Sequence, residues 1–330
     1  MPWGADEALY HLCEANAVPI FLLIPFAMVS IVLQIFFVAA GRPGLGFGLS
    51  IAGGVTNIVL DYVFTMKLGM GMFGAGLATI LGHCVAVLLY LLHFALHQNH
   101  LHLTRNFFDP AACVRVLRNG IGSSILELSA GLIVLLFNIA LLRVSGEAAV
   151  AIFSVLSNIA YVGKGVFNGM AQAAQPILST SYGAGRYDRV RAANRCAMTA
   201  AAIFSTVIYL ILVLCAGFIL PVFVEPSLVP MGSRAMRLYF LAFPFTGLNT
   251  VMMYAFQSLE KVRYTSVIAV LRGVVLISAA LMLFSVLWGE TGVWLALFAA
   301  EFTTYAVFTP VRSKVDRSLN QALALRPALR

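Results

Sequence analysis

The sequence predicts an all-α polytopic membrane protein with about nine transmembrane helices, and three observations carry that prediction. Hydrophobic residues make up 61% of the 330 residues and charged residues only 10%, whereas a soluble domain has roughly 50% and 25%. Apolar runs of bilayer-spanning length, about 20 residues each, follow one another along the chain. Basic residues gather in alternate loops. Soluble, disordered and coiled-coil classes are therefore excluded, and too little chain remains for a soluble catalytic domain.

The length of each apolar run predicts where the spans lie. A transmembrane helix needs about 20 apolar residues, and tilt allows some excess. The fifth run is long enough to include a turn or a kink. The predicted spans are 17–40, 46–66, 71–96, 119–142, 147–179, 192–222, 234–258, 265–288 and 291–311.

The charge pattern predicts the orientation. Most of the 21 basic residues fall on one side, in loops around Arg42, Arg118, Arg195 and Arg263 and in the tail 313–330. That side is cytoplasmic by the positive-inside rule, which places the C-terminus inside. The net charge of +8 is then explained by the basic residues of the cytoplasmic loops. No nucleic-acid partner is expected.

Cysteine and histidine do not indicate a metal centre. The five cysteines form no CxxC pair and are interpreted as reduced, small hydrophobic residues. His93 and His97 lie one helical turn apart, with His100 and His102 nearby, but no cysteine lies close and the first acid is Asp109. A solvated cluster at the membrane interface is the favoured interpretation.

An internal repeat relates the beginning and the end of the chain. Gly71 and Gly74 match Gly289 and Gly292 at an offset of 218 residues, and one residue further Arg42 matches Lys261. Spans one to three therefore resemble spans seven to nine, as a parallel repeat with a pseudo-two-fold axis along the membrane normal. Spans four to six have no counterpart, because it would lie about 100 residues before Met1. We expect a six-plus-six architecture of which three spans are absent.

The repeat also predicts the domain organisation. Residues 1–100 are the second half of an N-terminal lobe, with three spans, and 101–118 are a cytoplasmic loop between lobes. Residues 119–312 form a complete six-helix lobe, and 313–330 are a basic cytoplasmic tail.

Several short motifs follow one another along the chain. They are Asn57-Ile-Val-Leu-Asp61, Gly69-Met-Gly-Met-Phe-Gly-Ala-Gly-Leu-Ala-Thr79, Gln175-Pro176, Ser181-Tyr-Gly-Ala-Gly-Arg186, Arg272 and Gly292-Val-Trp-Leu-Ala296. In their order and spacing these motifs resemble the MATE (multidrug and toxic compound extrusion) transporters. The resemblance covers the chain from about residue 10 to residue 312 and lacks the family's first three helices.

The resemblance implies a secondary antiporter of the plasma membrane. Such proteins exchange sodium ions or protons for organic, mostly cationic, compounds through a cavity that opens alternately to each side. The implied partners are the lipid bilayer and small organic cations. The implied coupling ion is sodium or a proton, with no other cofactor, and we expect a monomer that is not an enzyme.

An ionised carboxylate at bilayer depth costs free energy, so an acidic residue within a span indicates a functional role. Asp61 lies about 9 Å below the predicted outer end of its span, one turn after Asn57, and Thr79 lies about 12 Å below the start of the next span. Their carboxylate, amide and hydroxyl oxygens suit a hard cation or a proton. The resemblance implies that they form the N-lobe cation site together with an Asp that this chain lacks. The alternative is a solvated or capped Asp61.

Two further acids are predicted sites in the C-terminal lobe. Glu127 lies about 12 Å from the cytoplasmic end of its span, and Glu301 about 15 Å from the outer end. Either could bind a cation or a proton. The alternative is a neutral carboxyl bonded to a neighbouring hydroxyl: Ser123 or Ser124 for Glu127, and Thr304 for Glu301.

Other polar or kinking residues in the spans have less specific interpretations. Lys164 is either a counter-ion or a side chain that reaches the interface, and the second is favoured. His83 aligns with Glu301 in the repeat; a structural histidine is the default and a proton relay the alternative. Pro25, Pro176 and Pro244 could bend helices around the substrate cavity during gating.

Three other functions are alternatives to the antiporter. A lipid-linked oligosaccharide flippase of the same superfamily would need a basic cavity, whereas the interior charges here are mostly acidic. A non-transporting remnant of a transporter is the second alternative. An intramembrane enzyme is disfavoured because the sequence has no HExxH or GxSxG motif.

Overall fold

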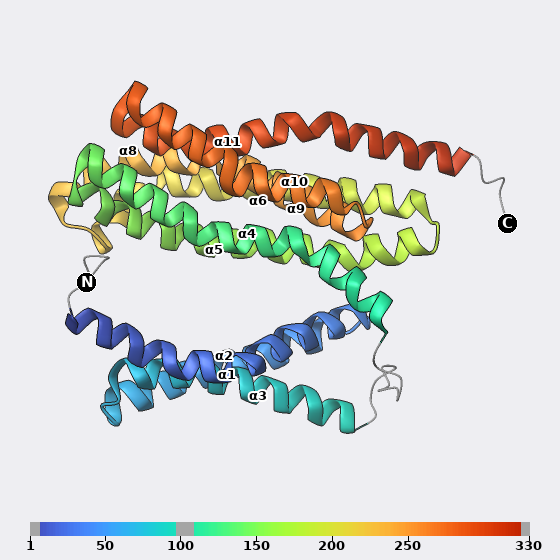
Figure 1. The fold of residues 1–330 in the computed structure, drawn as a ribbon, viewed down its shortest axis with the longest axis horizontal. Coiled ribbons are helices and arrows are strands. Elements are labelled where there is room, and N and C mark those ends of the chain that lie inside the picture. The colour runs from blue at the N-terminus through green and yellow to red at the C-terminus, as the bar shows by residue number, and fades with distance from the viewer. Residues whose placement is uncertain (1–6, 97–108, 325–330) are drawn as a thin grey trace. The chain divides into compact units, whose positions relative to one another are not determined.

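The computed structural model describes residues 7–96 and 109–324, which are helical and contain no strand. Contacts divide the chain into two compact units, Met1–Phe107 and Phe108–Arg330 (Figure 1). His97, His100, His102 and residues 101–108 of the predicted inter-lobe loop lie outside the described residues.

The first unit is a group of three long helical segments. α1 spans Glu7–Ala39, α2 spans Pro43–Asp61 and runs directly into a π-helix, η1, at Tyr62–Lys67, and α3 spans Gly71–Ala95. α3 packs against both other helices. Its core is small: Phe37, Ala86 and Tyr90 are buried, and the Tyr90 hydroxyl donates to the Gly46 carbonyl at 2.9 Å.

Glycine allows α2 and α3 to approach backbone to backbone. A Cβ atom on Gly82 would lie 2.7 Å from the Gly53 carbonyl oxygen, and one on Gly53 would lie 2.8 Å from the Gly82 oxygen. Small residues at such crossings are typical of membrane helix pairs, which lack a hydrophobic force between helices and rely on close packing.

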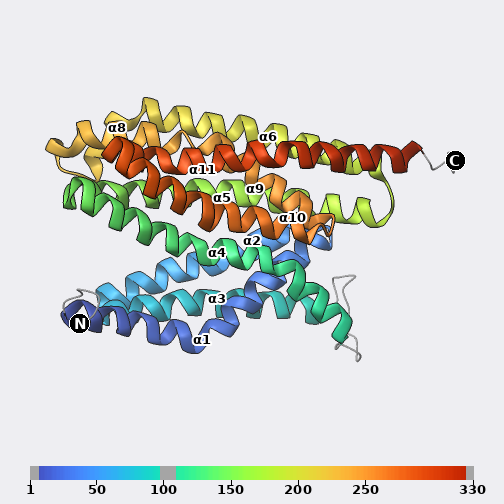
Figure 2. The same cartoon turned by 45° about the horizontal axis from the view of Figure 1, so that its top comes forward.

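The second unit contains the remaining helices. α6 packs against α5 and α9, and α4 packs against α10 and α11. Figure 2 shows α11 running lengthwise beside α6. The elements are α4 (Pro110–Ser145), α5 (Glu147–Gly183), α6 (Tyr187–Leu214), α7 (Ala216–Ile219), η2 (Leu220–Val222), η3 (Pro226–Leu228), α8 (Val229–Phe240), α9 (Phe243–Ser258), α10 (Val262–Val270), η4 (Leu271–Val275) and α11 (Leu276–Ala324).

An aromatic cluster forms the core of the second unit. Phe137 stacks on Phe153 with ring centroids 4.9 Å apart, and Tyr239 meets both rings edge-on. Trp294 packs beside Phe153 and donates its indole N–H to Glu290. By contrast, many large apolar side chains on the outside are exposed. Phe218 and Val286, for example, are 82% and 84% exposed. An apolar surface of this extent fits a lipid environment and not water.

The described residues contain eight helical segments long and apolar enough to cross a membrane. The last of them covers Val262–Leu319 and includes Gly289, whose φ of 56° and ψ of −133° break the helix. Gly289 therefore separates the predicted eighth and ninth spans, which accounts for the difference between eight segments and nine spans. All-α, multi-pass architecture is confirmed.

Two predicted irregular regions are partly helical. α4 begins at Pro110, within the predicted loop 101–118, and α11 continues to Ala324, within the predicted tail 313–330. In both cases a helix extends beyond its apolar run, because backbone hydrogen bonds do not require an apolar sequence outside the bilayer.

Backbone geometry at the turns agrees with the repeat. Gly71 and Gly289 have φ values of 55° and 56°, and the turns before α2 and α10 contain Gly41 and Glu260 at 77° and 53°. Positive φ is uncommon outside glycine. Its recurrence at equivalent positions supports a common origin for the two three-span segments.

Candidate functional site

A buried ion pair lies inside the second unit. The Arg272 guanidinium donates to Glu301 Oε1 from Nη2 at 2.7 Å and from Nε at 3.2 Å. Asn249 donates from Nδ2 to Glu301 Oε2 at 2.7 Å and to the Glu301 carbonyl at 2.8 Å. The three residues are 7%, 5% and 0% exposed. Both carboxylate oxygens of Glu301 are thus occupied by protein donors.

Three elements position this group. Asn249 is in α9, Glu301 in α11, and Arg272 in η4, a π-helical turn between α10 and α11. Single π-helical turns often occur at functional sites, since the extra residue redirects a side chain. Arg272 Nη1 also donates to the Thr250 hydroxyl at 3.3 Å. The network therefore fixes the guanidinium from two helices.

The predicted hydroxyl partners of the two acids are not those that the structure shows. Thr304 donates to the Ala300 carbonyl and not to Glu301, and Ser123 pairs with Gln257. A hydroxyl on a helix readily bonds the carbonyl one turn earlier. The partner of Glu301 is Arg272, whose role sequence reasoning missed. The signal available was the arginine itself, because an arginine inside a span needs a partner.

A cavity of about 290 Å³ opens beside this ion pair. Glu301 and Arg272 line it together with Glu127, Lys164 and Tyr239. Lys164 interacts electrostatically with Glu127 and Glu301, so the expectation that it reaches the interface was wrong. Two acids and two bases share this cavity, which corrects the prediction of a mostly acidic interior.

The first unit has its own cavity of about 210 Å³. Asn57, Thr79 and His83 line it, whereas Asp61 is not among its lining residues in the described part of the chain. Asp61 ends α2 immediately before the π-helix η1. Its Oδ1 atom and Asn57 Nδ2 are buried without a hydrogen-bond partner among the described residues. The structure therefore brings Asn57 and Thr79 to one cavity and leaves Asp61 beside it.

The two cavities are related by the repeat. His83 Nδ1 lies 3.4 Å from Ser30 Oγ. His83 aligns with Glu301 at an offset of 218 residues and Ser30 with Asn249 at 219. The same pair of positions thus carries a His–Ser contact in one unit and the Glu–Asn contact in the other.

The predicted prolines occupy two different settings. Pro25 and Pro176 lie inside α1 and α5. Pro244 is in the first turn of α9, just after the break at Leu241–Ala242 that separates α8 from α9. Proline is well tolerated in a first turn because the N–H it lacks has no partner there. No proline lines either of the two cavities described above.

Comparison with known proteins agrees with this architecture. The MatE family model matches residues 121–282. The multidrug export protein MepA of Staphylococcus saprophyticus is 21% identical over 302 residues, 90% of this chain and 66% of the relative. MepA of Staphylococcus haemolyticus is 22% identical, over 85% of this chain and 62% of the relative. The chain thus spans about two thirds of the length of these curated relatives.

Solved structures share the fold. A MATE protein in complex with MaL6 superposes with a TM-score of 0.90 at 21% identity, over 96% of this chain and 73% of that one. The helical architecture is that of a multi-pass membrane protein. The MatE family model and the export-protein relatives place it with transporters and not with enzymes. The MatE family model, the MepA relatives and the solved MATE structures together support a MATE family transporter.

Proposed function

We propose that the chain belongs to a multidrug exporter of the plasma membrane that exchanges a sodium ion or a proton for organic, mostly cationic, compounds. The observation that carries the proposal is the cavity beside Glu301, which holds ionisable side chains within membrane-spanning helices. Such groups are expensive in a bilayer and mark ion or substrate pathways. The relatives named multidrug export protein support the direction and the breadth of transport.

The geometry around Glu301 suggests how a cation and a substrate could be coupled. Because Arg272 and Asn249 occupy both carboxylate oxygens, an incoming cation reaches Glu301 only if at least one of these two donors moves away. This movement would change the electrostatic potential at Lys164 and Glu127, which line the same cavity. A ligand shifts two conformations only by its differential affinity for them, and displacement of Arg272 supplies such a difference.

Asn57, Asp61 and Thr79 are proposed as the cation or proton site of the first unit. The unpartnered Oδ1 of Asp61 is a free acceptor among the described residues, and carboxylate oxygens are preferred ligands of hard cations. One-for-one exchange with a monovalent cationic substrate moves no net charge, so the concentration gradient of the coupling ion drives it. With a neutral substrate, one charge crossing a potential of 100 mV adds about 2.3 kcal/mol.

The test uses the full chain in proteoliposomes that contain a fluorescent organic cation. A sodium gradient and a proton gradient are imposed separately, and export of the dye is followed. We expect export with one of the gradients, and at least a tenfold slower rate with Glu301→Gln and with Asp61→Asn. Glu147→Gln is the matched control, because Glu147 is an exposed acid in the first turn of α5.

Two results would contradict the proposal. Absence of dye movement under both gradients, with folded protein in the membrane, would favour the non-transporting alternative. Normal export by both variants would leave transport intact and refute the assigned ion sites.

A flippase for a pyrophosphate-linked lipid is the second candidate, favoured by Lys164 and Arg272 on one cavity. Arg272 is engaged by Glu301, so Lys164 alone would face the pyrophosphate. This leaves the antiporter as the better supported function. Transbilayer movement of a fluorescent pyrophosphate lipid, with no dye export, would make the flippase the better supported function.

A further inference from the structure

The start of α6 and the end of α11 together carry a concentration of positive charge. Four arginines, one asparagine, one serine and one aspartate line a groove of about 240 Å³ between these helices. We call it the arginine groove. Its residues are Arg191, Asn194, Arg195, Arg312, Ser313, Asp316 and Arg317.

The residues that line the groove are mostly basic. Arg312 forms an ion pair with Asp316 at 3.8 Å, and Arg317 Nε donates to the Ser313 carbonyl at 3.3 Å. Asp316 is the one acid among the groove residues, against four arginines. Like charges held this close repel one another, so an anion in the groove would stabilise the fold.

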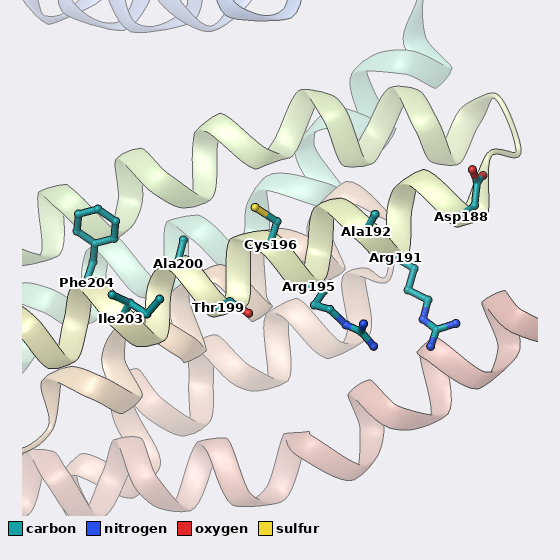
Figure 3. A pocket seen from close by; sticks show the side chains of 9 residues that line it. All are labelled: Asp188, Arg191, Ala192, Arg195, Cys196, Thr199, Ala200, Ile203 and Phe204. Carbon is teal, nitrogen blue, oxygen red and sulfur yellow. The ribbon is translucent and has the colours of Figure 1, made fainter.

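The groove continues onto an apolar strip of α6. A second, shallow surface region of about 900 Å³, lined by α6 alone, shares Arg191 and Arg195 and extends along the helix to Ile203 and Phe204. Figure 3 shows the two guanidinium groups extending from α6 toward α11, with Ile203 further along the helix and the Phe204 ring on the side of α6 away from the guanidinium groups. The carboxylate of Asp188 lies away from both guanidinium groups.

Length and exposure define the shape of a matching ligand. From Arg191 to Phe204 the helix rises about 20 Å. Ile203 and Phe204 are exposed. A ligand that fits both parts has a compact anionic head and a flexible apolar tail of acyl-chain length.

We propose that the arginine groove and the adjoining strip of α6 bind one anionic phospholipid. Its phosphate lies among the guanidinium groups of Arg191, Arg195 and Arg312, and one acyl chain crosses the exposed surface of α6 obliquely toward Ile203 and Phe204. Guanidinium groups match phosphate oxygens in charge and geometry, and basic pockets beside membrane helices are known to hold lipid head groups. The proposal rests on membrane insertion and not on the proposed transport activity.

The experiment titrates the full chain, purified in a neutral detergent, with phosphatidylglycerol and reads bound lipid by native mass spectrometry. Phosphatidylcholine with the same acyl chains, glycerol phosphate and inorganic phosphate are the comparison ligands. We expect one phosphatidylglycerol per chain to bind preferentially. The double substitution Arg191→Gln and Arg195→Gln should weaken phosphatidylglycerol binding about thirtyfold, because each arginine contributes about fivefold.

Matched variants separate this site from general charge attraction. Arg189→Gln removes a charge from the same exposed turn of α6 but does not line the groove, and should leave affinity unchanged. Arg312→Gln removes a groove arginine from the other helix and should weaken binding. Gel filtration verifies that each variant remains folded.

Four results would overturn the proposal. Equal affinity for phosphatidylcholine would remove the role of charge, and equal affinity for glycerol phosphate or inorganic phosphate would reduce the site to a free-anion site. An equal loss with Arg189→Gln would indicate nonspecific attraction. Unchanged binding in both groove variants would place the lipid elsewhere.

Discussion

The residue with the largest energetic consequence is Glu301. Its carboxylate is buried and satisfied by Arg272 and Asn249, so removal of either charge leaves the other unpaired in the protein interior. Breaking a buried pair on one side typically costs about 3–5 kcal/mol, whereas replacing both partners by apolar groups is often nearly neutral.

This asymmetry gives a prediction at the residue scale. Arg272→Met should lower the free energy of unfolding by about 3–5 kcal/mol, and the double substitution with Glu301→Leu should recover most of that loss. Thermal or denaturant unfolding in detergent measures both. The interpretation fails if the single variant is as stable as the parent, or if the second substitution adds a further loss.

At the scale of elements, the crossing of α2 and α3 depends on glycine. Gly53 and Gly82 face each other so closely that a side chain on either meets the opposite backbone. The same crossing carries Asn57 and Thr79 to the cavity of the first unit. Packing between these helices and the geometry of the candidate site are therefore linked.

Gly82→Ala should separate α2 from α3 and destabilise the protein by about 1–3 kcal/mol, the usual cost of overpacking. Gly54→Ala is the control on the same helix pair, because a Cβ atom there has nothing within 4 Å. The control should be neutral or stabilising by about 0.5–1 kcal/mol, since alanine favours helix. Equal stability of the two variants in unfolding experiments would show that the crossing tolerates a side chain.

At the scale of the whole molecule, the charge pattern predicts how the chain crosses the membrane. Cys13 lies before the first predicted span and Cys113 in the predicted cytoplasmic loop, and both side chains are exposed. In intact cells, a membrane-impermeant maleimide should label a variant whose single cysteine is Cys13. It should label a variant that retains only Cys113 after permeabilisation alone. The opposite pattern would invert the predicted topology.

Much of the architecture could be predicted from local sequence. Gly71 and Gly289 were matched by the repeat, and both adopt positive φ at the start of an equivalent helix. The predicted spans coincide with helical segments because a bilayer demands a continuous apolar run of fixed length. Helix ends were less predictable, as α4 and α11 show, because a helix can continue beyond the bilayer.

The candidate site was only partly predictable. Glu301 could be predicted as a site residue because a carboxyl group at that depth in the membrane is energetically costly. Asn57 and Thr79 were also predicted, and both line one cavity. Arg272 could not be assigned to Glu301, since the two are 29 residues apart in sequence and meet through a π-helical turn. The position of Lys164 on the same cavity likewise depends on the rotation of α5.

The sequence by itself determined a multi-pass helical membrane protein with a repeated three-span unit, because apolar length and glycine turns are local properties of the chain. Only the tertiary structure decided which buried charges meet, which cavity each one lines, and where arginines from two distant helices form one groove. Those choices depend on how each helix is rotated about its own axis, and that rotation is set by packing against helices far away in sequence.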